Sequence, residues 1–507
     1  MSWGSDMFQV TEETMEAVKA ATSGISTTTG IAGVNIGELV SLVPVDTPFF
    51  NSTARKGANQ GARFAFWQSL TNVNSQQPDI GTPFDSAGQL VLVEDQYISA
   101  QFVPMALGGT VTEDALATAQ GYADALAVNT LQVINQFLIG CDIHQLNAQG
   151  YALPTIATPI LTASTTGGNI TGSATAYVKV AARSGVNYYR GGSGVASTEA
   201  SQATTGSTAS VAGFVTAVKG AAAYDWYVGS SPGAEYYYTT TTTNAVTITA
   251  IPTVAQKVPA LAGIYNAGST GPAAVPTADT SYNSYWQNGL TASILGDWSS
   301  SPDQLGASSG LTFANLVTPG SGVSQGAYWL SLDGAQLSVS GAALEQIDVV
   351  NKTIYDTYNV STTRMLMGSQ TITDIANALL DNPQAVTWLV PTDASGRARL
   401  VAGGAVAIYL NKTVNGKPIT LELQPHLPPG QIVFVVDEIP FPGANITNPL
   451  QVETLIDFWR FDYGAGRTLN SNTGGPRYDF EIRSLQAFEN KAAPVMGVLS
   501  NIGAGIA

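Results

Sequence analysis

A run of apolar residues at helical spacing places the strongest constraint on the fold of this chain. After Thr110-Val-Thr-Glu113, which has the form of a capping box, apolar side chains recur at steps of three, four and seven. These positions are Leu116, Ala119, Ala123, Leu126, Val133, Phe137 and Cys141. The spacing predicts one amphipathic helix of about 35 residues, roughly 50 Å long. Because a core of ordinary size does not need such a helix, we expect a spine along which other elements lie.

The residues before this helix predict an arm followed by a long hairpin. Residues 1–50 combine modest helical content with a Ser/Thr/Gly-rich passage, and the residue before Pro48 is expected to be extended. Strand-like alternation begins at Phe64 and again at Tyr97, with about 25 polar, Gly- and Pro-containing residues between them. Loops longer than about 12–15 residues are uncommon unless functional or disordered, so this connection is either a surface flap or an interaction arm.

The composition changes at Pro154, and until about Val258 the chain has few charges and many Thr, Ser, Gly, Ala and Tyr residues. Several short strands at close spacing predict a small β-sandwich inserted into the host domain. The tract from Thr239 to Thr243 is expected to be an edge strand or a turn. The segment from Gly220 to Val228 resembles a strand that recurs in immunoglobulin-like and fibronectin type III modules.

The remainder of the chain predicts mixed α and β structure. After an irregular passage over residues 259–327, apolar spacing predicts helices near 344–355 and 372–380, with a strand at 363–367 between them. The C-terminal part is rich in strands, at 405–410, 419–423, 432–436, 453–461 and 478–486. The expected fold class is therefore α+β with an inserted all-β sandwich.

Composition excludes several classes of protein. Of the 507 residues only 11% are charged, against about 25% in ordinary soluble domains, and the net charge is -16. So little charge indicates that much of the surface is buried against other chains, although an extracellular Ser/Thr/Gly-rich protein would also fit. A chain this acidic has no basic groove for reading nucleic acid. The single Cys141 excludes an intramolecular disulfide and a thiolate zinc site.

The sequence predicts neither export by the usual signal nor insertion into a membrane. The first residues, Met1-Ser-Trp-Gly-Ser-Asp6, are polar and lack the basic and apolar regions of a secretory signal. The longest dense apolar run, at 431–437, has the length of a strand, and we expect no window near the ~20 apolar residues of a membrane span.

Residues that could carry chemistry are few. The two histidines have structural explanations: His144 lies in the last turns of the long helix, where a cation suits the helix dipole, and His426 lies in a rigid Pro-rich loop. No Gly-x-Ser-x-Gly elbow is present. The segments 464–469 and 410–413 are incomplete phosphate-binding loops and are interpreted as turns.

Paired acids are candidates for glycoside cleavage, which needs two carboxylates that face each other across a cleft. The adjacent pairs are Glu94-Asp95, Glu113-Asp114 and Asp437-Glu438. Neighbouring acids point apart on a strand, and Glu113-Asp114 suits the start of a helix, so structural roles are favoured. We predict no catalytic, cofactor-binding or metal-binding residues, and no enzyme activity.

The order of arm, long hairpin, spine helix, compact mixed domain and closing strands resembles the major capsid protein of tailed bacteriophages. Four stretches carry the resemblance: residues 45–50 leading into Lys56-Gly57, the long helix from Glu113, residues 332–337, and residues 430–435. The resemblance covers nearly the whole chain except about 154–258, where members of the family sometimes carry an immunoglobulin-like insertion.

The resemblance implies a division of the chain into parts. These are an N-terminal arm (1–50), an extended loop (51–108), a peripheral domain with the spine helix (109–153, continued at 259–367 and closed by strands at 446–507), the inserted sandwich (154–258) and an axial domain (368–445). It also implies self-assembly through pentamers and hexamers into an icosahedral head that encloses double-stranded DNA, in the virion and, during assembly, in the host cytoplasm. Implied partners are a portal protein, possible scaffold or decoration proteins, and DNA contacted non-specifically, with no membrane.

Two features limit what is carried over from that family. No long charged coiled segment that would serve as a fused scaffold is present in the sequence. Some relatives cross-link a loop lysine to a neighbouring asparagine, but Lys56 is expected at the base of the loop and not at its tip, so no cross-link is predicted.

Two other classes of function compete with the capsid hypothesis. A surface adhesin or carbohydrate-binding protein would place its function in residues 154–258, and a glycoside-active enzyme would need one of the acid pairs to be essential. Because inserted domains are commonly dispensable to their host, we expect deletion of about 156–256 to permit assembly.

Overall fold

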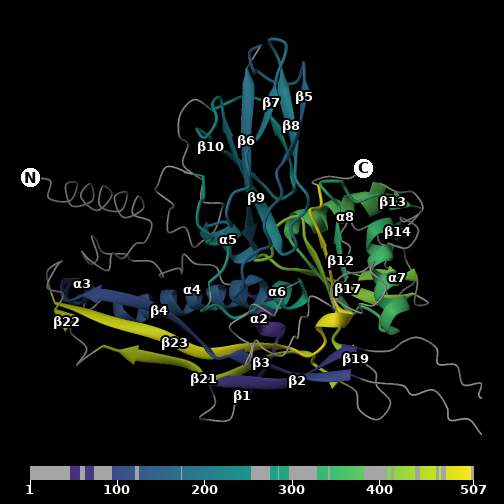
Figure 1. The fold of residues 1–507 in the computed structure, drawn as a ribbon. Helices are drawn as coiled ribbons and strands as arrows, with labels where there is room; N and C mark the ends of the chain where they lie inside the picture. The colour runs from purple at the N-terminus through teal and green to yellow at the C-terminus, as the bar shows by residue number, and fades with distance from the viewer. Residues whose placement is uncertain are drawn as a thin grey trace, which may run out of the picture.

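The computed structural model describes residues 46–57, 63–72, 94–119, 125–172, 174–252, 275–283, 285–295, 328–340, 343–381, 408–412, 416–439, 446–463, 468–469 and 476–503. In Figure 1 a long sheet and a helix lie along the bottom, a β-sandwich stands above them, and a compact α+β unit lies at the right. The mixed α+β class predicted from the sequence is confirmed. The expected arm at 1–45 lies outside the described residues.

The long sheet, called the platform sheet here, joins strands from three distant parts of the chain. Its central strand β23 pairs antiparallel with β21 and with β4, and β21 pairs in parallel with β1. Its strands are β1 (Ala54–Gly57), β4 (Val103–Thr112), β21 (Leu450–Asp462), β22 (Thr468–Leu469) and β23 (Pro476–Asn490).

The predicted spine is present as two described helices, α3 (Glu113–Ala119) and α4 (Ala125–Asn147), and residues 120–124 lie outside the described residues. The predicted capping position is wrong. Thr110 belongs to β4, and the backbone N–H of Ala115 instead donates to the Thr112 hydroxyl at 3.3 Å. Strand β4, which the sequence pattern did not predict, reaches Thr112 because β23 supplies pairing partners that far.

Helix α4 lies on the platform sheet, with Val133, Phe137 and Cys141 buried against Phe480 and Ile482 of β23. By length and composition α4 alone among the described helices could cross a membrane, so the expectation that no such window exists is wrong. Every residue from Cys141 to Asn147 is buried by protein, and these include Asp142, Gln145 and Asn147. Buried polar residues packed against other parts of the chain are typical of a core helix, and we interpret α4 as one.

The long hairpin has the predicted strands. Strand β2 (Phe64–Asn72) pairs antiparallel with β3 (Glu94–Gln101), from Phe64 opposite Gln101 to Asn72 opposite Glu94. The Trp67 indole N–H at the base donates to the Asn490 carbonyl at 3.2 Å, which ties the hairpin to the end of β23. The connection over 73–93 lies outside the described residues.

Residues 160–248 form two sheets on a shared core. One sheet has the order β10-β9-β6-β7 and the other β11-β8-β5, and Trp226 and Tyr224 are among the largest fully buried side chains between them. Strand β10 is at an edge, so the Thr-rich tract begins in an edge strand, one of the two predicted alternatives. The strands are β5 (Ile160–Ser164), β6 (Thr175–Ser184), β7 (Ala200–Ala203), β8 (Ser210–Phe214), β9 (Ala221–Gly229), β10 (Tyr236–Thr241) and β11 (Ala245–Ile248). The likeness to immunoglobulin-like modules stays a prediction.

The inserted region extends beyond the predicted boundary at 258. The backbone N–H of Ala196 donates to the Pro276 carbonyl at 3.1 Å, and that of Thr280 donates to the Ser193 carbonyl at 2.9 Å, so the returning segment packs on the sandwich. The N–H of Leu153 donates to the Ser281 hydroxyl at 3.3 Å. Leu153 and Ser281, on either side of this region in the sequence, therefore lie side by side.

The compact unit at the right of Figure 1 is built on a six-stranded sheet of order β12-β24-β18-β15-β17-β16. The predicted axial domain of 368–445 is too narrow, because β12, β15 and β24 lie outside it and yet belong to this sheet. Its strands are β12 (Tyr328–Ser331), β15 (Arg364–Met367), β16 (Ile408–Asn411), β17 (Lys417–Leu423), β18 (Ile432–Val435) and β24 (Gly497–Ser500). Pairing of β12 with β24 joins residues about 170 positions apart, which no local pattern in the sequence indicates.

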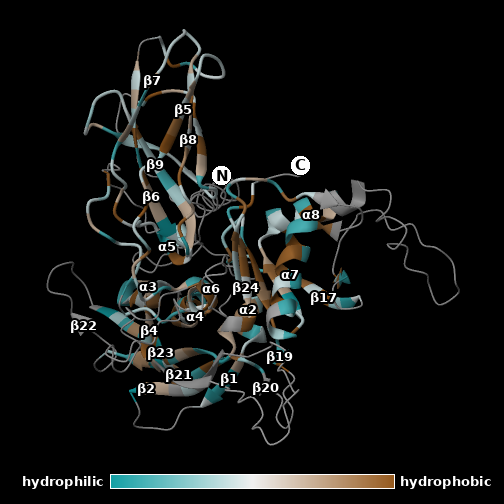
Figure 2. Ribbon diagram, turned by 45° about the vertical axis from the view of Figure 1, so that its right-hand side comes forward, coloured by the Kyte–Doolittle hydropathy of each residue, from teal (hydrophilic) through white to brown (hydrophobic). Residues whose placement is uncertain are grey.

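Two predicted helices cover this sheet. Helix α7 (Glu345–Tyr358) and helix α8 (Ser369–Asp381) agree with the apolar spacing, and Ile347, Val350 and Ile354 of α7 are fully or almost fully buried against the sheet. Figure 2 shows hydrophobic residues concentrated on α7 and on the neighbouring strands.

The sandwich also contacts the six-stranded unit. The Asn244 amide donates to the Asp333 carboxylate at 2.8 Å, and the Gln431 amide donates to the Ala221 carbonyl at 3.3 Å. Asp333 and Gly334 both have positive φ, 51° and 83°, which forms the tight turn that receives Asn244. The sandwich is thus held by contacts to two other parts of the chain.

Candidate assembly surface

The outer edge of β21 is the most unusual surface of the described structure. Strand β1 pairs only with Gln451 to Thr454, and beyond Thr454 this edge has no strand partner among the described residues. The residues that follow are large and hydrophobic, and each is 39–41% exposed. We call them the aromatic edge: Ile456, Phe458, Trp459, Phe461 and Tyr463.

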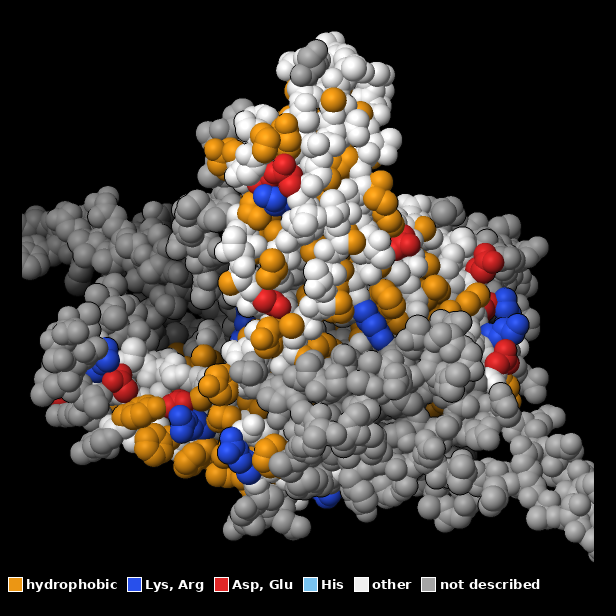
Figure 3. Space-filling view, in the orientation of Figure 1, with side chains coloured by type: hydrophobic (Ala, Val, Ile, Leu, Met, Phe, Trp, Pro, Cys, Tyr) orange, Lys and Arg blue, Asp and Glu red, His pale blue; other side chains and the backbone are white. Residues whose placement is uncertain are grey.

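Free edges of sheets are normally protected by charge, proline or a covering element, because unpaired backbone groups recruit other chains. Here three rings form a row instead, with centroids 5.9 Å apart for Trp459 and Phe461 and 5.2 Å for Phe461 and Tyr463. Figure 3 shows hydrophobic side chains gathered at the lower left, where Figure 1 places β21 and β23. An exposed apolar row of this kind is typical of an interaction surface.

Charges around the aromatic edge are neutralised locally. Arg460 pairs with Asp462 at 3.0 Å, Arg477 with Asp479 at 3.0 Å, and Arg483 with Glu481 at 2.8 Å. Each pair joins residues two positions apart on one strand, which therefore lie on the same face. A partner with the same surface would meet no net repulsion here.

Phe458 packs the aromatic edge against helix α4 and against Arg55 of β1. Its ring lies edge-on to Phe137 of α4 with centroids 5.6 Å apart, and the Arg55 guanidinium lies 4.9 Å from its centroid. The same guanidinium lies 4.1 Å from the Phe50 ring and donates to Asp457 at 3.2 Å. These contacts hold Phe50 and Arg55, which precede the hairpin, against both β21 and α4.

A second anchor is a buried junction centred on Asp142 of α4. One carboxylate oxygen accepts the backbone N–H of Phe50 at 2.8 Å, and the other lies 2.6 Å from Nδ1 of His426. The Asn147 amide donates to the His426 carbonyl at 2.7 Å. The junction joins α2 (Pro48–Ser52), the spine helix and the loop before β18, and Asp142 is fully buried within it. His426 thus has a structural partner 284 residues away that its Pro-rich surroundings did not reveal.

His144 is not the cation expected at the end of α4. It is buried edge-on to Trp286, with ring centroids 5.6 Å apart. Burial, and secondarily the charge of Arg190, lowers the pKa of His144 to about 3. The imidazole is therefore neutral at physiological pH, and the correction follows from packing that covers the helix end.

The burial of His144 predicts acid sensitivity. Because its pKa is about 3 when folded and near 6.5 when exposed, the unfolded state binds more protons between these values. Stability should therefore fall as pH drops from 6.5 towards 3, by about 1.4 kcal/mol per pH unit from this group. In His144→Gln, the slope of the unfolding free energy against pH, measured by urea titrations between pH 6 and 4, should be shallower by that amount. Equal slopes in the two proteins would contradict the assignment.

The structure places the three acid pairs on different elements. Glu113 and Asp114 lie in the first turn of α3, as predicted, and the Arg364 guanidinium donates to both carboxylate oxygens of Asp437 at 2.7 to 2.9 Å. Glu438 lies in the short strand β19 (Glu438–Ile439). Glu94 and Asp95 begin β3.

The other candidates are placed as follows. Lys56 lies in β1, at the base of the hairpin, with Nζ 3.7 Å from Glu453. Cys141 is buried, and burial raises its pKa to about 12, so it is a thiol. Among the described residues no group of three His, Cys, Asp or Glu side chains could hold a metal ion. Residues 413 and 464–467 of the two incomplete phosphate loops lie outside the described residues.

Comparison with known proteins gives a match only among solved structures. No family model matches the chain, and no curated protein matches it. The capsid of a native GTA particle is similar, with TM-score 0.40, 8% identity, and coverage of 93% of this chain and 95% of that one. The capsid of cyanophage A-1(L) has TM-score 0.40, 12% identity and coverage of 93% and 97%, and that of Myoviridae phage XM1 has 0.36, 8%, 95% and 97%.

These similar structures are named as capsids, two of them as capsids of phages. With TM-scores of 0.40 or less and identities of 12% or less, the similarity does not establish a family for this chain.

Sequence reasoning placed a strand at 453–461 but missed the aromatic edge. The sequence does indicate this surface, because aromatic residues occupy both even and odd positions of the strand, at Phe458, Trp459 and Phe461. A strand with one buried face alternates, so apolar residues on both faces indicate either a buried strand or an exposed face that a partner covers. Burial decides between the two, and here residues 457–463 are all exposed.

Proposed function

We propose that this chain is a shell-building subunit, the major capsid protein of a tailed bacteriophage, which assembles through pentamers and hexamers into an icosahedral head around double-stranded DNA. The observation that carries this proposal is the aromatic edge on the long platform sheet, in a chain with only 11% charged residues. An exposed apolar surface of this kind is typical of an interaction site, and in a symmetric assembly the partner is a second copy of the chain.

The hairpin and the net charge of the chain also support the proposal of shell assembly. The two-stranded hairpin of β2 and β3 is tied to the platform sheet at its base by Trp67, and we propose that it contacts a neighbouring subunit. Several contacts of modest strength per copy add to a strong assembly, because each closed contact raises the effective concentration for the next. The proposed partners are further copies, a portal protein, any scaffold or decoration protein, and packaged DNA, which a net charge of -16 would not bind tightly.

A surface adhesin or carbohydrate-binding protein is the second candidate, and one observation favours it. The outward face of β5, β8 and β11 forms a shallow, uncharged hollow of about 340 Å³ that includes Ile160, Thr162 and Phe214. Hydroxyl groups beside one aromatic ring suit a neutral ligand such as a glycan. The opposite sheet of the sandwich is covered by the returning segment at 275–281.

Electron microscopy of two proteins tests the proposal. The full-length chain is compared with a variant in which residues 154–280 are replaced by a short Gly-Ser linker, since Leu153 and Ser281 are adjacent. We expect shells, tubes or rings of five and six subunits from both, with projections missing from the deletion variant. Monomers from both proteins, even at high concentration with a crowding polymer that substitutes for a scaffold, would contradict the capsid proposal. Binding of the full-length monomer on a glycan array would then support the second candidate.

A further inference from the structure

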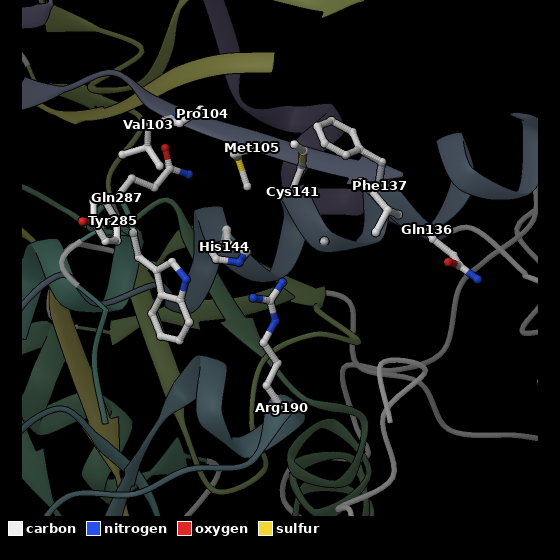
Figure 4. A pocket seen from close by; sticks show the side chains of 14 residues that line it. Val103, Pro104, Met105, Gln136, Phe137, Cys141, His144, Arg190, Tyr285 and Gln287 are labelled. Carbon is white, nitrogen blue, oxygen red and sulfur yellow. The ribbon is translucent and has the colours of Figure 1, made fainter. Parts of the chain in front are cut away.

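A cavity of about 220 Å³ lies where the start of β4, helix α4 and the loop at 285–287 meet below the sandwich. Figure 4 shows side chains from these elements directed into it. Its apolar wall includes Met105, Phe137 and Cys141, and its polar groups include Arg190 and Gln287. Phe137 of the cavity wall also contacts Phe458 of the aromatic edge, but Arg190 and Gln287 belong to neither the aromatic edge nor the Asp142 junction.

Gln287 is the first reason to assign a ligand to this cavity. The residue is only 2% exposed, yet neither Nε2 nor Oε1 of its amide has a hydrogen-bond partner. Figure 4 places this amide near Val103 and Met105, on the cavity side. A buried amide without partners costs about 1–3 kcal/mol, so such groups in native proteins are normally satisfied by protein, water or ligand.

The charge of the cavity is the second reason. Arg190, at the end of α5 (Gly185–Arg190), directs its guanidinium towards His144, and among the described residues that line the cavity no other side chain is charged. Its charge contributes to the low pKa of His144, and the buried Cys141 stays a thiol, so both of these groups are neutral. The cavity therefore combines one positive charge, a buried amide and an apolar wall, with no carboxylate in its lining.

We propose that this cavity binds a small monocarboxylic acid with an apolar body. The carboxylate would accept hydrogen bonds from the Arg190 guanidinium and from Nε2 of Gln287, and the apolar body would lie against Met105 and Phe137. An engineered cavity of about 150 Å³ holds benzene, so 220 Å³ has room for one ring with a short acid arm. Phenylacetate is a ligand of this size and chemistry.

Arg190 comes from α5, which follows β6 of the sandwich, whereas Met105 comes from β4 of the platform sheet and Phe137 from helix α4. The site therefore exists only when both parts are in place, and a bound acid would link them. A bound acid would therefore stabilise the packing of the sandwich against β4 and helix α4.

Equilibrium dialysis of the full-length protein against 4-fluorophenylacetate tests the proposal, with the free probe measured by fluorine NMR. We expect saturable binding of one probe per chain, and at least tenfold weaker binding in Arg190→Gln and in Gln287→Met. The matched control Arg477→Gln removes an exposed arginine elsewhere and should bind as the parent does. The neutral probe 4-fluorotoluene reports whether the cavity of each variant is intact, and it should bind all four proteins equally weakly.

Three outcomes would overturn the proposal. The first is that no saturable binding of the acid is found at probe concentrations up to about 10 mM, about the weakest affinity worth assigning to a site. Water would then be the occupant of the cavity. The second is equal binding of 4-fluorophenylacetamide, which would remove the role of Arg190. The third is equal binding of the acid to the parent, Arg190→Gln and Gln287→Met, which would place the bound acid outside this cavity. Because dialysis of dissociated subunits needs no shell, failure of this proposal is distinguishable from failure of the capsid proposal.

Discussion

Replacing Trp459 and Phe461 with serine should abolish assembly and leave the subunit folded. Both rings are about 40% exposed on an edge that lacks a partner among the described residues, so their loss removes little from the core. At ~25 cal/mol per Å² and about 180 Å² of exposed ring surface, covering both rings is worth roughly 4.5 kcal/mol per contact. A shell repeats this loss at every copy, and so we expect no closed particles.

The assay is negative-stain microscopy together with light scattering, and thermal unfolding followed by circular dichroism establishes that the variant is folded. Ile160→Ser is the matched control, because Ile160 is 64% exposed but lies on the sandwich. This control should assemble as the parent chain does. Normal shells from the double variant would show that the aromatic edge is not an assembly contact.

Asp142→Ala should lower the free energy of unfolding by about 3 kcal/mol. The substitution removes the acceptor for the Phe50 N–H and the partner of His426 Nδ1, and both donors then stay buried without a partner. Removing one member of a buried, hydrogen-bonded pair costs about 3–5 kcal/mol, and the lower end applies where a small cavity admits water.

Asp142→Asn is the control for this prediction. Its amide oxygen can still accept from the Phe50 N–H, so it should lose about half as much stability as the alanine variant. Urea unfolding followed by tryptophan fluorescence measures both variants. A loss below 1 kcal/mol in Asp142→Ala would mean that the junction does not hold the three elements together, which is the role that its geometry gives it.

Local patterns in the sequence predicted most of the individual elements. The spacing from Leu116 to Cys141 predicted the spine, alternation after Phe64 and Tyr97 predicted the hairpin strands, and apolar residues at Ile347, Val350 and Ile354 predicted α7. These signals are local, because the period of side chains along a helix or strand is set by backbone geometry within a few residues.

The errors came where a distant segment decided the outcome. Thr110 did not cap the helix because β23 extends β4 to Thr112, and the insertion did not end at 258 because residues 275–281 return along the sandwich. The axial domain was drawn too narrow because β12, β15 and β24 join its sheet from outside. None of these pairings leaves a mark in the sequence of either partner alone.

The sequence by itself determined the kinds of elements, their order, the inserted β region and the scarcity of charge that indicates burial against other chains. Only the tertiary structure decided which surfaces stay open and which polar groups meet: the aromatic edge of β21, the pairing of Asp142 with His426, and the cavity at Gln287. The physical reason is that periodicity is a property of one segment, whereas burial and pairing depend on what packs against that segment. Residues such as Trp459 have the same local pattern whether a strand of the same chain or a second copy covers them.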